Sequence, residues 1–344
     1  INNIVSKNDF INGQINRKVE DKFSKKYKLG YSSLVSSGTD ALYLALRLLK
    51  TKYKKGEIIT TPFTFFSPTE TILNAGFKPI YADINLFDYN ISVKSIEDKI
   101  NKNTIAILPV HIFGYPCDMN KIVKLAKKHN LFVIEDCAQA LGAKIKNKFV
   151  GTFGDINAFS FYPTKNLGAY GDAGLISTKN KKYFNHLKLL KNHGCKVPYE
   201  HLIVGENSRC DTFQASVLNE KLKLIDTLNK KRNLIAKKYF KLLKNNRYIK
   251  LPKYDANNKS IYHQFTILVE SRDKLLKHLI KNKIPHMIYY KKPLYKQKFL
   301  KKNKIKLNNV EYVVKKCISL PIHPSLKDFE IHQVCKTINQ FYNK

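Results

Sequence analysis

The fold of this chain is decided by the stretch LFVIEDCAQALGAKIKNKFVGTFGDINAFSFYPTKNLGAYGDAGLIS, residues 131–177. It contains an apolar, strand-like run that ends in Glu135 and Asp136, a second apolar run at 158–161, and Lys165 in a turn framed by proline and glycine. A pyridoxal phosphate enzyme requires such a pair, because the aldehyde needs a lysine amine and the pyridinium nitrogen needs a carboxylate. An ordinary strand–helix segment with a solvated lysine fits the same spacing, so the stretch alone leaves both interpretations open.

Strand-like and helical patterns alternate on the N-terminal side of this stretch. Short apolar runs favour strands at 31–35, 57–60, 79–83, 104–110 and 131–135, and periodic apolar residues favour helices between them at 41–49, 68–75, 93–100 and 119–129. This alternation predicts an α/β fold of parallel βαβ units, whose functional loops lie at the carboxyl ends of the strands. Four segments fall at such ends and are therefore expected to share a site: 36–40, 63–66, 111–114 and 136–139.

Residues 36–40, with the sequence SSGTD, open the first of these helices. Hydroxyl groups and a glycine at a helix start can bind an anion through backbone N–H groups and the helix dipole, or they can act only as an N-cap. The cluster of Phe63, Phe65 and Phe66 is equally open, since it fits either core packing or, for one ring, a flat face against a planar ligand.

The C-terminal side of the chain predicts a second, smaller unit. Helical patterns at 183–192 and 212–228, the latter extended to about 243, lead into a polar stretch at 245–258. We expect a large domain over residues 1–245, of which 1–25 can pack elsewhere, and a small α+β domain over 246–344. The small domain is predicted to have strands at 260–270 and 285–290 and helices at 272–282, 310–318 and 326–339.

Length and cysteine content agree with this organisation. The 344 residues exceed the ~250–300 at which one hydrophobic core usually stops growing. The six cysteines are scattered without a Cys-x-x-Cys or Cys/His cluster, which argues against a disulfide framework and against a zinc site, and we expect no metal. No apolar run approaches the ~18–20 residues of a membrane span, and the N-terminus lacks signal-peptide features, so we expect a cytoplasmic protein.

The charge balance raises a nucleic-acid hypothesis. There are 62 basic residues against 26 acidic ones, a net charge of +36. The lysines are spread over the whole length instead of forming one stripe, which is typical of solvated helix faces. We therefore expect no specific nucleic-acid partner, but a field that favours anionic ligands such as nucleotide diphosphates.

Seven motifs in order carry a resemblance to a known family. They are SSGTDAL, TTPFTFFSPT, VHIFGYPCDM, IEDCAQALGA, FSFYPTKNLGAYGDAG, GENSRCDTFQASVL and IYHQFTI. The chain resembles the sugar aminotransferases of the DegT/DnrJ/EryC1/StrS family, which are pyridoxal phosphate enzymes with the type I, aspartate aminotransferase-like fold. The resemblance covers almost the whole chain and implies a large domain with a mostly parallel mixed sheet and a small C-terminal α+β domain.

The resemblance assigns the cofactor residues. Lys165 and Asp136 are the implied catalytic residues, because Lys165 would form the Schiff base with the cofactor and Asp136 would keep the ring nitrogen protonated. Gln139 would face the phenolic oxygen of the ring, and Phe65 would stack on the ring. The phosphate would be bound by Gly38, Thr39 and Ser160.

One further residue links the site to a second subunit. Asn207 resembles the family residue that reaches the phosphate from the neighbouring subunit, which implies a homodimer with shared active sites. Candidates for substrate contact are His193, Tyr162, Arg209 and Tyr295. His193 fits an ordinary loop histidine equally well, and Tyr295 stands where many relatives carry histidine.

The resemblance also implies the reaction. The lysine is present where related sugar dehydratases carry histidine, which favours transamination. L-Glutamate would convert the cofactor to pyridoxamine phosphate, and a nucleotide-linked keto-sugar would then take the amine. The motifs resemble most the branch that acts at C3 of UDP- or dTDP-linked keto-sugars, giving an amino sugar for surface polysaccharide, lipopolysaccharide or glycan. The alternatives are a 4-keto sugar, a sugar dehydratase and a non-catalytic basic binding protein.

Overall fold

The computed structural model describes residues 2–300 and 305–343, and its large unit is built on a seven-stranded sheet with the order β1-β9-β8-β5-β4-β2-β3. Adjacent strands are parallel except at β9, which is antiparallel to both β1 and β8. The predicted α/β fold with a mostly parallel mixed sheet is thus confirmed. The strands are β1 (Tyr31–Val35), β2 (Glu57–Thr60), β3 (Lys78–Tyr81), β4 (Thr104–Leu108), β5 (Phe132–Asp136), β8 (Ile156–Ser160) and β9 (Gly174–Thr178).

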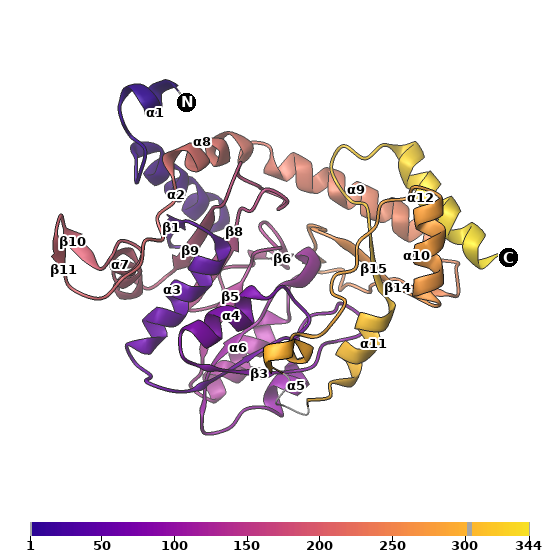
Figure 1. Cartoon of the computed structure of the whole chain (residues 1–344), viewed down its shortest axis with the longest axis horizontal. Helices are drawn as coiled ribbons and strands as arrows, with labels where there is room; N and C mark the ends of the chain where they lie inside the picture. Colours follow the sequence, from indigo (N-terminus) through magenta and orange to yellow (C-terminus); the bar gives the residue numbers. More distant parts are fainter. Residues whose placement is uncertain (1, 301–304, 344) are drawn as a thin grey trace.

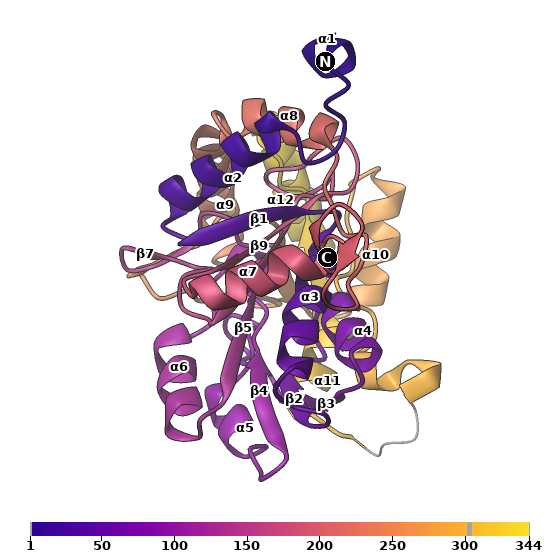
Figure 2. The same ribbon diagram turned by 90° about the vertical axis from the view of Figure 1, so that its left-hand side faces the viewer.

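Side chains of the central strands alternate between two hydrophobic cores, as a period of two residues requires. In β2, Ile58 packs in the core formed with α3 and α4, and Ile59 packs in the opposite core formed with α5 and α6. Leu108 and Ile107 of β4 divide in the same way. Figure 2 shows these two pairs of helices on opposite sides of the sheet. The helices are α3 (Gly38–Lys50), α4 (Ser67–Asn74), α5 (Val93–Glu97) and α6 (Met119–Lys128).

Three more helices cover the end of the sheet at β1. Phe23 of α2 and Leu218 of α8 pack with strands β1, β8 and β9 in a third core, whereas Leu187 of α7 packs on the α3 side. The helices are α2 (Gln14–Tyr27), α7 (Lys181–Leu190) and α8 (Thr212–Lys221), preceded by a short α1 (Asn2–Ser6). Small peripheral strands are β6 (Lys144–Ile145), β7 (Lys148–Phe149), β10 (Cys195–Val197), β11 (Glu200–His201) and β13 (Asn258–Lys259).

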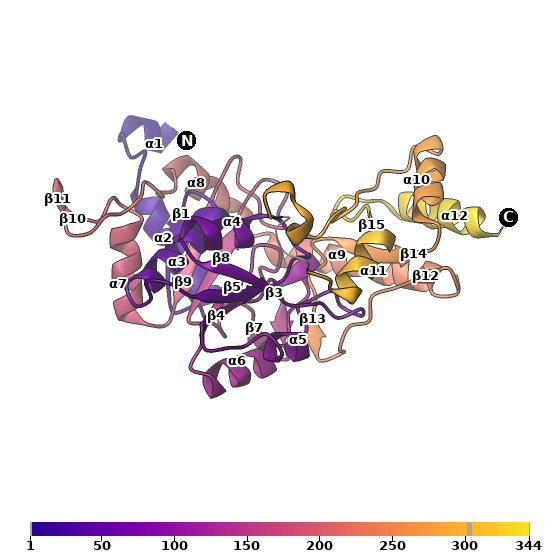
Figure 3. The same cartoon turned by 60° about the horizontal axis from the view of Figure 1, so that its bottom comes forward.

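The smaller unit lies at the far end of α9 (Ile225–Leu243), which runs out of the large unit (Figures 1 and 3). It contains the antiparallel sheet β12-β14-β15 and a core of its own. That core includes Ile235 and Tyr239 of α9, so packing within the small unit begins before residue 245, and the division of the chain at 245 stays a prediction. The remaining elements are β12 (Ile249–Lys250), β14 (Phe265–Val269), α10 (Arg272–Lys281), α11 (Asn308–Lys316), β15 (Cys317–Leu320) and α12 (Asp328–Tyr342).

Several local predictions differ from the structure, and three of them concern the type or the continuity of an element. The predicted helix 310–318 ends at Lys316, because Cys317–Leu320 pairs with β14 as a strand. The continuous helix expected from 212 to 243 is interrupted between Lys221 and Ile225. The strand expected at 285–290 is reduced to a single bridge between Met287 and Ser319.

Among the described helices, none combines the length and the apolar character of a membrane span.

Candidate active site

Lys165 and Asp136 are positioned at the ends of adjacent strands. Asp136 ends β5 and pairs in register with Ala158 of β8, and Lys165 lies in the turn after β8, where its N–H donates to the Tyr162 carbonyl at 2.8 Å. Burial raises the pKa of Asp136, while the Ala138 N–H at 2.9 Å and the charge of Lys165 oppose that rise. Burial lowers the pKa of Lys165, and Asp136 opposes that fall. Each group therefore supports the charged form of the other in surroundings that disfavour charge.

Gln139 has a fixed amide orientation beside this pair. Its Oε1 accepts a hydrogen bond from the Phe113 N–H at 2.7 Å, and its Nε2 donates to the Tyr290 hydroxyl at 3.3 Å. Because a backbone N–H can only donate, the Gln139 NH₂ group is the one left to face Tyr290 and the site. Sequence reasoning missed Tyr290, which lies 151 residues away along the chain and has no local motif that marks the contact.

The start of α3 lies so close to the end of β8 that only glycine fits between them. A Cβ on Gly38 would come 2.6 Å from the Cβ of Ser160. The Ser37 side chain caps the helix, and the Thr39 hydroxyl lies 2.7 Å from that of Ser67. The free N–H groups and dipole of this 13-residue helix, with the hydroxyls of Thr39 and Ser160, form a cradle suited to a phosphate.

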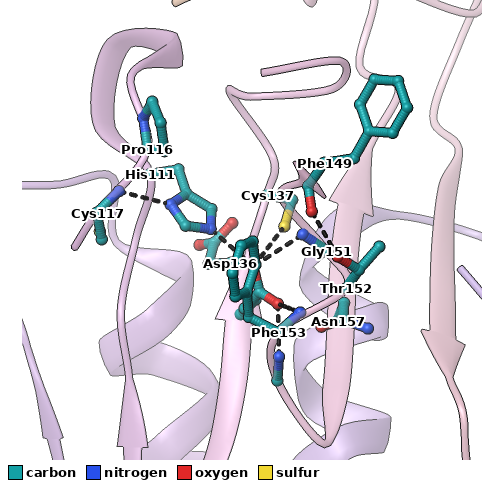
Figure 4. Close-up of polar contacts among 12 residues, drawn as sticks. His111, Pro116, Cys117, Asp136, Cys137, Phe149, Gly151, Thr152, Phe153 and Asn157 are labelled. Atoms are coloured by element: carbon teal, nitrogen blue, oxygen red, sulfur yellow. Dashed lines mark hydrogen bonds and ion pairs between the residues drawn. The ribbon is translucent and has the colours of Figure 1, made fainter. Parts of the chain in front are cut away.

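A buried hydrogen-bond network holds the carboxyl end of β5, as Figure 4 shows. His111 Nδ1 accepts from the Cys117 N–H at 3.0 Å, so the ring proton lies on Nε2, which donates to Glu135 at 3.0 Å. Glu135 also accepts from the backbone N–H groups of Gly151 at 2.7 Å and Phe153 at 2.6 Å. Burial would raise the pKa of Glu135, but His111 and the N–H groups of Gly151 and Gly154 lower it overall, so the carboxylate is held ionised.

The same network contains one group with the spacing of metal ligands. Ligand-type atoms of His111, Glu135 and Cys137 lie within 4.8 Å of one another. Both ring nitrogens of His111 are already hydrogen-bonded, and both Glu135 oxygens accept backbone N–H groups. A metal ion would have to break these bonds, so we assign the cluster a structural role.

Two aromatic residues of the predicted site are exposed near it. Phe65 exposes 61% of its surface and Tyr162 exposes 52%, whereas Phe63 is buried. Phe65 follows β2 at the same sheet edge as Asp136, so it is the ring of its cluster that remains available to stack on a planar ligand.

Asn207 and Arg209 lie beside the approach to the Gly38 cradle in the same chain. The carbonyl of Ser208, between them, accepts the Ser36 N–H at 3.1 Å, and Arg209 donates to the Asn192 side chain at 3.0 Å. Both residues line a cavity of about 310 Å³ with Ser36. The role of Asn207 toward a neighbouring subunit stays a prediction.

The two other substrate candidates lie in different surroundings. His193 is exposed in a turn, where its carbonyl is 2.9 Å from the ring of His201. Tyr295 is only 3% exposed, and its hydroxyl donates to Glu311 at 2.8 Å. Tyr295 would have to give up this bond to contact a sugar, and its role toward the substrate stays a prediction.

This site and fold define a class of protein: a strand-end acid, a half-buried lysine and a glycine-lined phosphate cradle on this sheet belong to a type I pyridoxal phosphate enzyme. The chain belongs to the DegT/DnrJ/EryC1/StrS aminotransferase family, whose model matches residues 1–339. It is a pyridoxal phosphate-dependent aminotransferase.

Known relatives cover nearly the whole chain. A UDP-N-acetyl-3-dehydro-alpha-D-glucosamine 3-aminotransferase of Acidithiobacillus ferrooxidans is 37% identical over 99% of this chain and 92% of that protein. The GDP-perosamine synthase of Escherichia coli O157:H7 is 34% identical over 99% of this chain and 92% of that protein. The crystal structure of Streptomyces venezuelae DesV in complex with a ketimine intermediate has a TM-score of 0.96 and 30% identity, covering 100% of this chain and 93% of that one.

The residues present fit the cofactor. The Gly38–Ser160 cradle, which a Cβ would fill, suits its phosphate. Bound pyridoxal phosphate supplies an aldehyde and an electron-withdrawing ring. Lys165 would hold it covalently and then carry a proton to and from the reacting carbon, a role aided by its lowered pKa. Asp136 would keep a proton on the ring nitrogen, and the Gln139 NH₂ group would donate to the ring oxygen.

Proposed function

We propose that this enzyme transfers the amine of L-glutamate to the C3 keto group of a UDP- or dTDP-linked sugar. The observation that carries the proposal is the convergence of Lys165, Asp136 and the Gly38 cradle in a chain that shares 37% identity with an enzyme named for 3-amination. The product would be an amino sugar for surface polysaccharide or lipopolysaccharide. A 4-keto sugar is the second candidate, since the site residues described above act on the cofactor and the amine and do not determine which sugar carbon is aminated.

The lysines near the site support a nucleotide-linked substrate. Lys291 directly follows Tyr290, which contacts Gln139, and lines a cavity of about 490 Å³ together with Lys292, Lys296 and Lys315. Glu311 lines the same cavity and pairs with Lys296 at 2.6 Å, which leaves the ammonium groups of Lys291, Lys292 and Lys315 to favour a diphosphate through their charge. The free state of all six cysteines agrees with a reducing compartment, and we propose that the enzyme works in the cytoplasm.

A panel of substrates tests this proposal. The purified enzyme is loaded with pyridoxal phosphate and mixed with L-glutamate and, in turn, 3-keto and 4-keto sugars linked to UDP or dTDP. Mass spectrometry should detect an amino sugar with the 3-keto series, and Lys165→Ala should yield none. Amination of the 4-keto series alone would move the reaction to C4, whereas a deoxygenated product would indicate a dehydratase.

We further propose that the active form is a homodimer with shared sites. Exposed apolar side chains near the cradle support a second copy there: Ile11, Tyr162 and Tyr170 expose 47%, 52% and 78% of their surfaces. Mixing two inactive variants tests the sharing. A heterodimer of Lys165→Ala and Asn207→Ala chains contains one site with an intact lysine and an intact partner asparagine, so activity should return. If Asn207 acts within its own chain, the mixture stays inactive.

A further inference from the structure

The motif IYHQFTI brings a buried histidine to the residue that follows Lys165. His263 is 9% exposed, and its Nδ1 lies 3.1 Å from the side-chain Oδ1 of Asn166. The two residues are 97 positions apart along the chain, so the contact depends on the tertiary structure. None of the roles assigned above to the cofactor or substrate involves His263.

The hydrogen bonds around Asn166 determine where the His263 proton lies. The Asn166 Nδ2 donates to the Asn229 Oδ1 at 2.7 Å and to the Ile261 carbonyl at 3.0 Å. Both NH₂ protons are used, so the Asn166 Oδ1 must accept, and His263 must donate from Nδ1. This hydrogen bond fixes a proton on Nδ1. Burial lowers the pKa of the His263 ring well below the usual value, and the charges of Lys165 and Arg232 lower it further, so the ring is neutral and its Nε2 carries a lone pair.

The backbone that carries His263 is held on two sides. Arg232 on α9 donates to the carbonyls of Tyr262 at 3.2 Å and His263 at 3.3 Å. On the other side lies Gly114, in the loop after β4. A Cβ on Gly114 would come 2.8 Å from the backbone nitrogen of His263, so this loop packs against His263 at a distance that only glycine permits. The imidazole is therefore fixed relative to both α9 and the loop that supports Gln139.

We propose that His263 is a positioning residue for amino transfer, which acts by donating its Nδ1–H to Asn166 and so fixing the turn that holds Lys165. A neutral ring suits this role, because a protonated imidazole would place a second cation close to the lysine amine. The proposal rests on the assignment of Lys165 as the cofactor-binding lysine, since holding this turn matters only if that amine must meet the cofactor precisely. A small displacement of a reacting group can cost about 100-fold in rate.

A double-mutant cycle tests the proposed contact. His263→Leu keeps the size but removes the donor, and His263→Asn retains a donor close to the position of Nδ1. In the half-reaction with glutamate, followed by the visible absorbance of bound pyridoxal phosphate, His263→Leu should be slower by about 10–100-fold, and His263→Asn should recover most of the rate. In an Asn166→Ala background, His263→Leu should cost little more.

Two results would overturn the proposal. One is a His263→Leu enzyme with a lower melting temperature but a wild-type half-reaction, which would leave His263 with a purely structural role. The other is full additivity of the His263 and Asn166 effects.

Asn233 provides the matched control. It donates to the carbonyls of Asn229 and Ser260, next to the residues that surround Asn166, but forms no hydrogen bond with His263. Should His263→Leu not fold, Asn166→Ala must still slow the half-reaction while Asn233→Ala does not. Equal slowing by both would also reject the proposal.

Failure of the underlying assignment gives a different signature. If Lys165→Ala kept the visible band of bound pyridoxal phosphate, the lysine assignment itself would be wrong. A wild-type enzyme that reacts with glutamate but aminates no keto-sugar would contradict only the proposed sugar substrate.

Discussion

At the scale of single residues, the site depends on charges held in places that disfavour them. Burial raises the pKa of Asp136 and lowers the pKa of Lys165, so the two pKa values move toward each other. Their mutual attraction opposes both shifts. A cationic ring next to Asp136 would stabilise its ionised form further, so the acid gains its function when the cofactor is bound.

Replacing Asp136 with asparagine should slow the glutamate half-reaction by about 100–1,000-fold, the range seen when a group that stabilises developing charge is removed. An amide can still accept the Ala138 N–H, so the fold should persist, but it carries no charge to hold a proton on the ring nitrogen. Stopped-flow absorbance measures the rate. Asp118→Asn is the control, since Asp118 caps α6 at the surface and asparagine caps equally well. A wild-type rate in Asp136→Asn would assign the ring proton to another group.

A second acid, Asp88, predicts a pH dependence of stability. Burial raises its pKa to about 6, against the N–H of Asn90, from an ordinary value of 3.8. The folded chain then binds this proton more tightly than the unfolded chain, so the free energy of unfolding falls as pH rises from about 4 to about 6 and stays low above that. Asp88→Asn should therefore raise the free energy of unfolding at pH 7.5 by about 1–3 kcal/mol.

Urea denaturation at two pH values checks the sign of this effect. At pH 4 the carboxyl is largely protonated in the folded protein, and the difference between Asp88→Asn and wild type should shrink strongly. A difference that is equal at both pH values would mean that the substitution acts through packing and not through the charge.

At the scale of elements, local patterns predicted those parts of the site whose position follows from the strand order. Asp136, Gln139 and Lys165 lie on or just after β5 and β8, so alternation of strands and helices placed them at one edge. Tyr290 and His263 could not be predicted in this way, because tertiary folding brings them to the site from segments about 100 or more residues away.

The misread segment 310–318 has a similar cause. Its apolar residues recur at helical spacing, but Cys317 and Ile318 turn to pair with Leu268 and Ile267 of β14. That pairing lies outside any local window, so tertiary contacts overrode the local preference.

The start of α3 gives a prediction about the cofactor. Gly38→Ala would place a Cβ 2.6 Å from that of Ser160, and neither backbone can yield without moving α3 or β8. Such overpacking typically costs about 1–3 kcal/mol, so affinity for pyridoxal phosphate should fall by about 5- to 100-fold. Fluorescence titration measures it. Gly13→Ala is the control, because the atoms nearest to its Cβ would belong to the carboxylate end of the flexible Asp9 side chain. Unchanged affinity in Gly38→Ala would place the phosphate elsewhere.

At the scale of the whole molecule, the small unit is part of the active-site architecture. Arg232, on the helix that leads into it, holds the backbone of His263, and the segment carrying Tyr290 returns to the large unit to meet Gln139. The packing of the two units therefore sets the geometry around Lys165. If the small unit separates from the large unit, the active site should lose its geometry before the large unit unfolds.

The net charge of +36 gives the last prediction. A positive field raises the local concentration of anionic substrates, and salt screens it, with a Debye length of about 10 Å at 0.1 M. The kcat/KM for a nucleotide-linked keto-sugar should fall by about 3- to 10-fold between 20 and 300 mM NaCl, while kcat stays nearly constant because chemistry in the buried site is not screened. The double variant Lys291→Glu with Lys292→Glu reverses two charges at the cavity next to Tyr290, and it should weaken the dependence of kcat/KM on salt. The same double change at the distant Lys54 and Lys55 should leave the dependence as in the wild type. If kcat/KM did not change with salt in the wild type and both variants, the lysines would be ordinary solvated surface residues and would not attract the substrate.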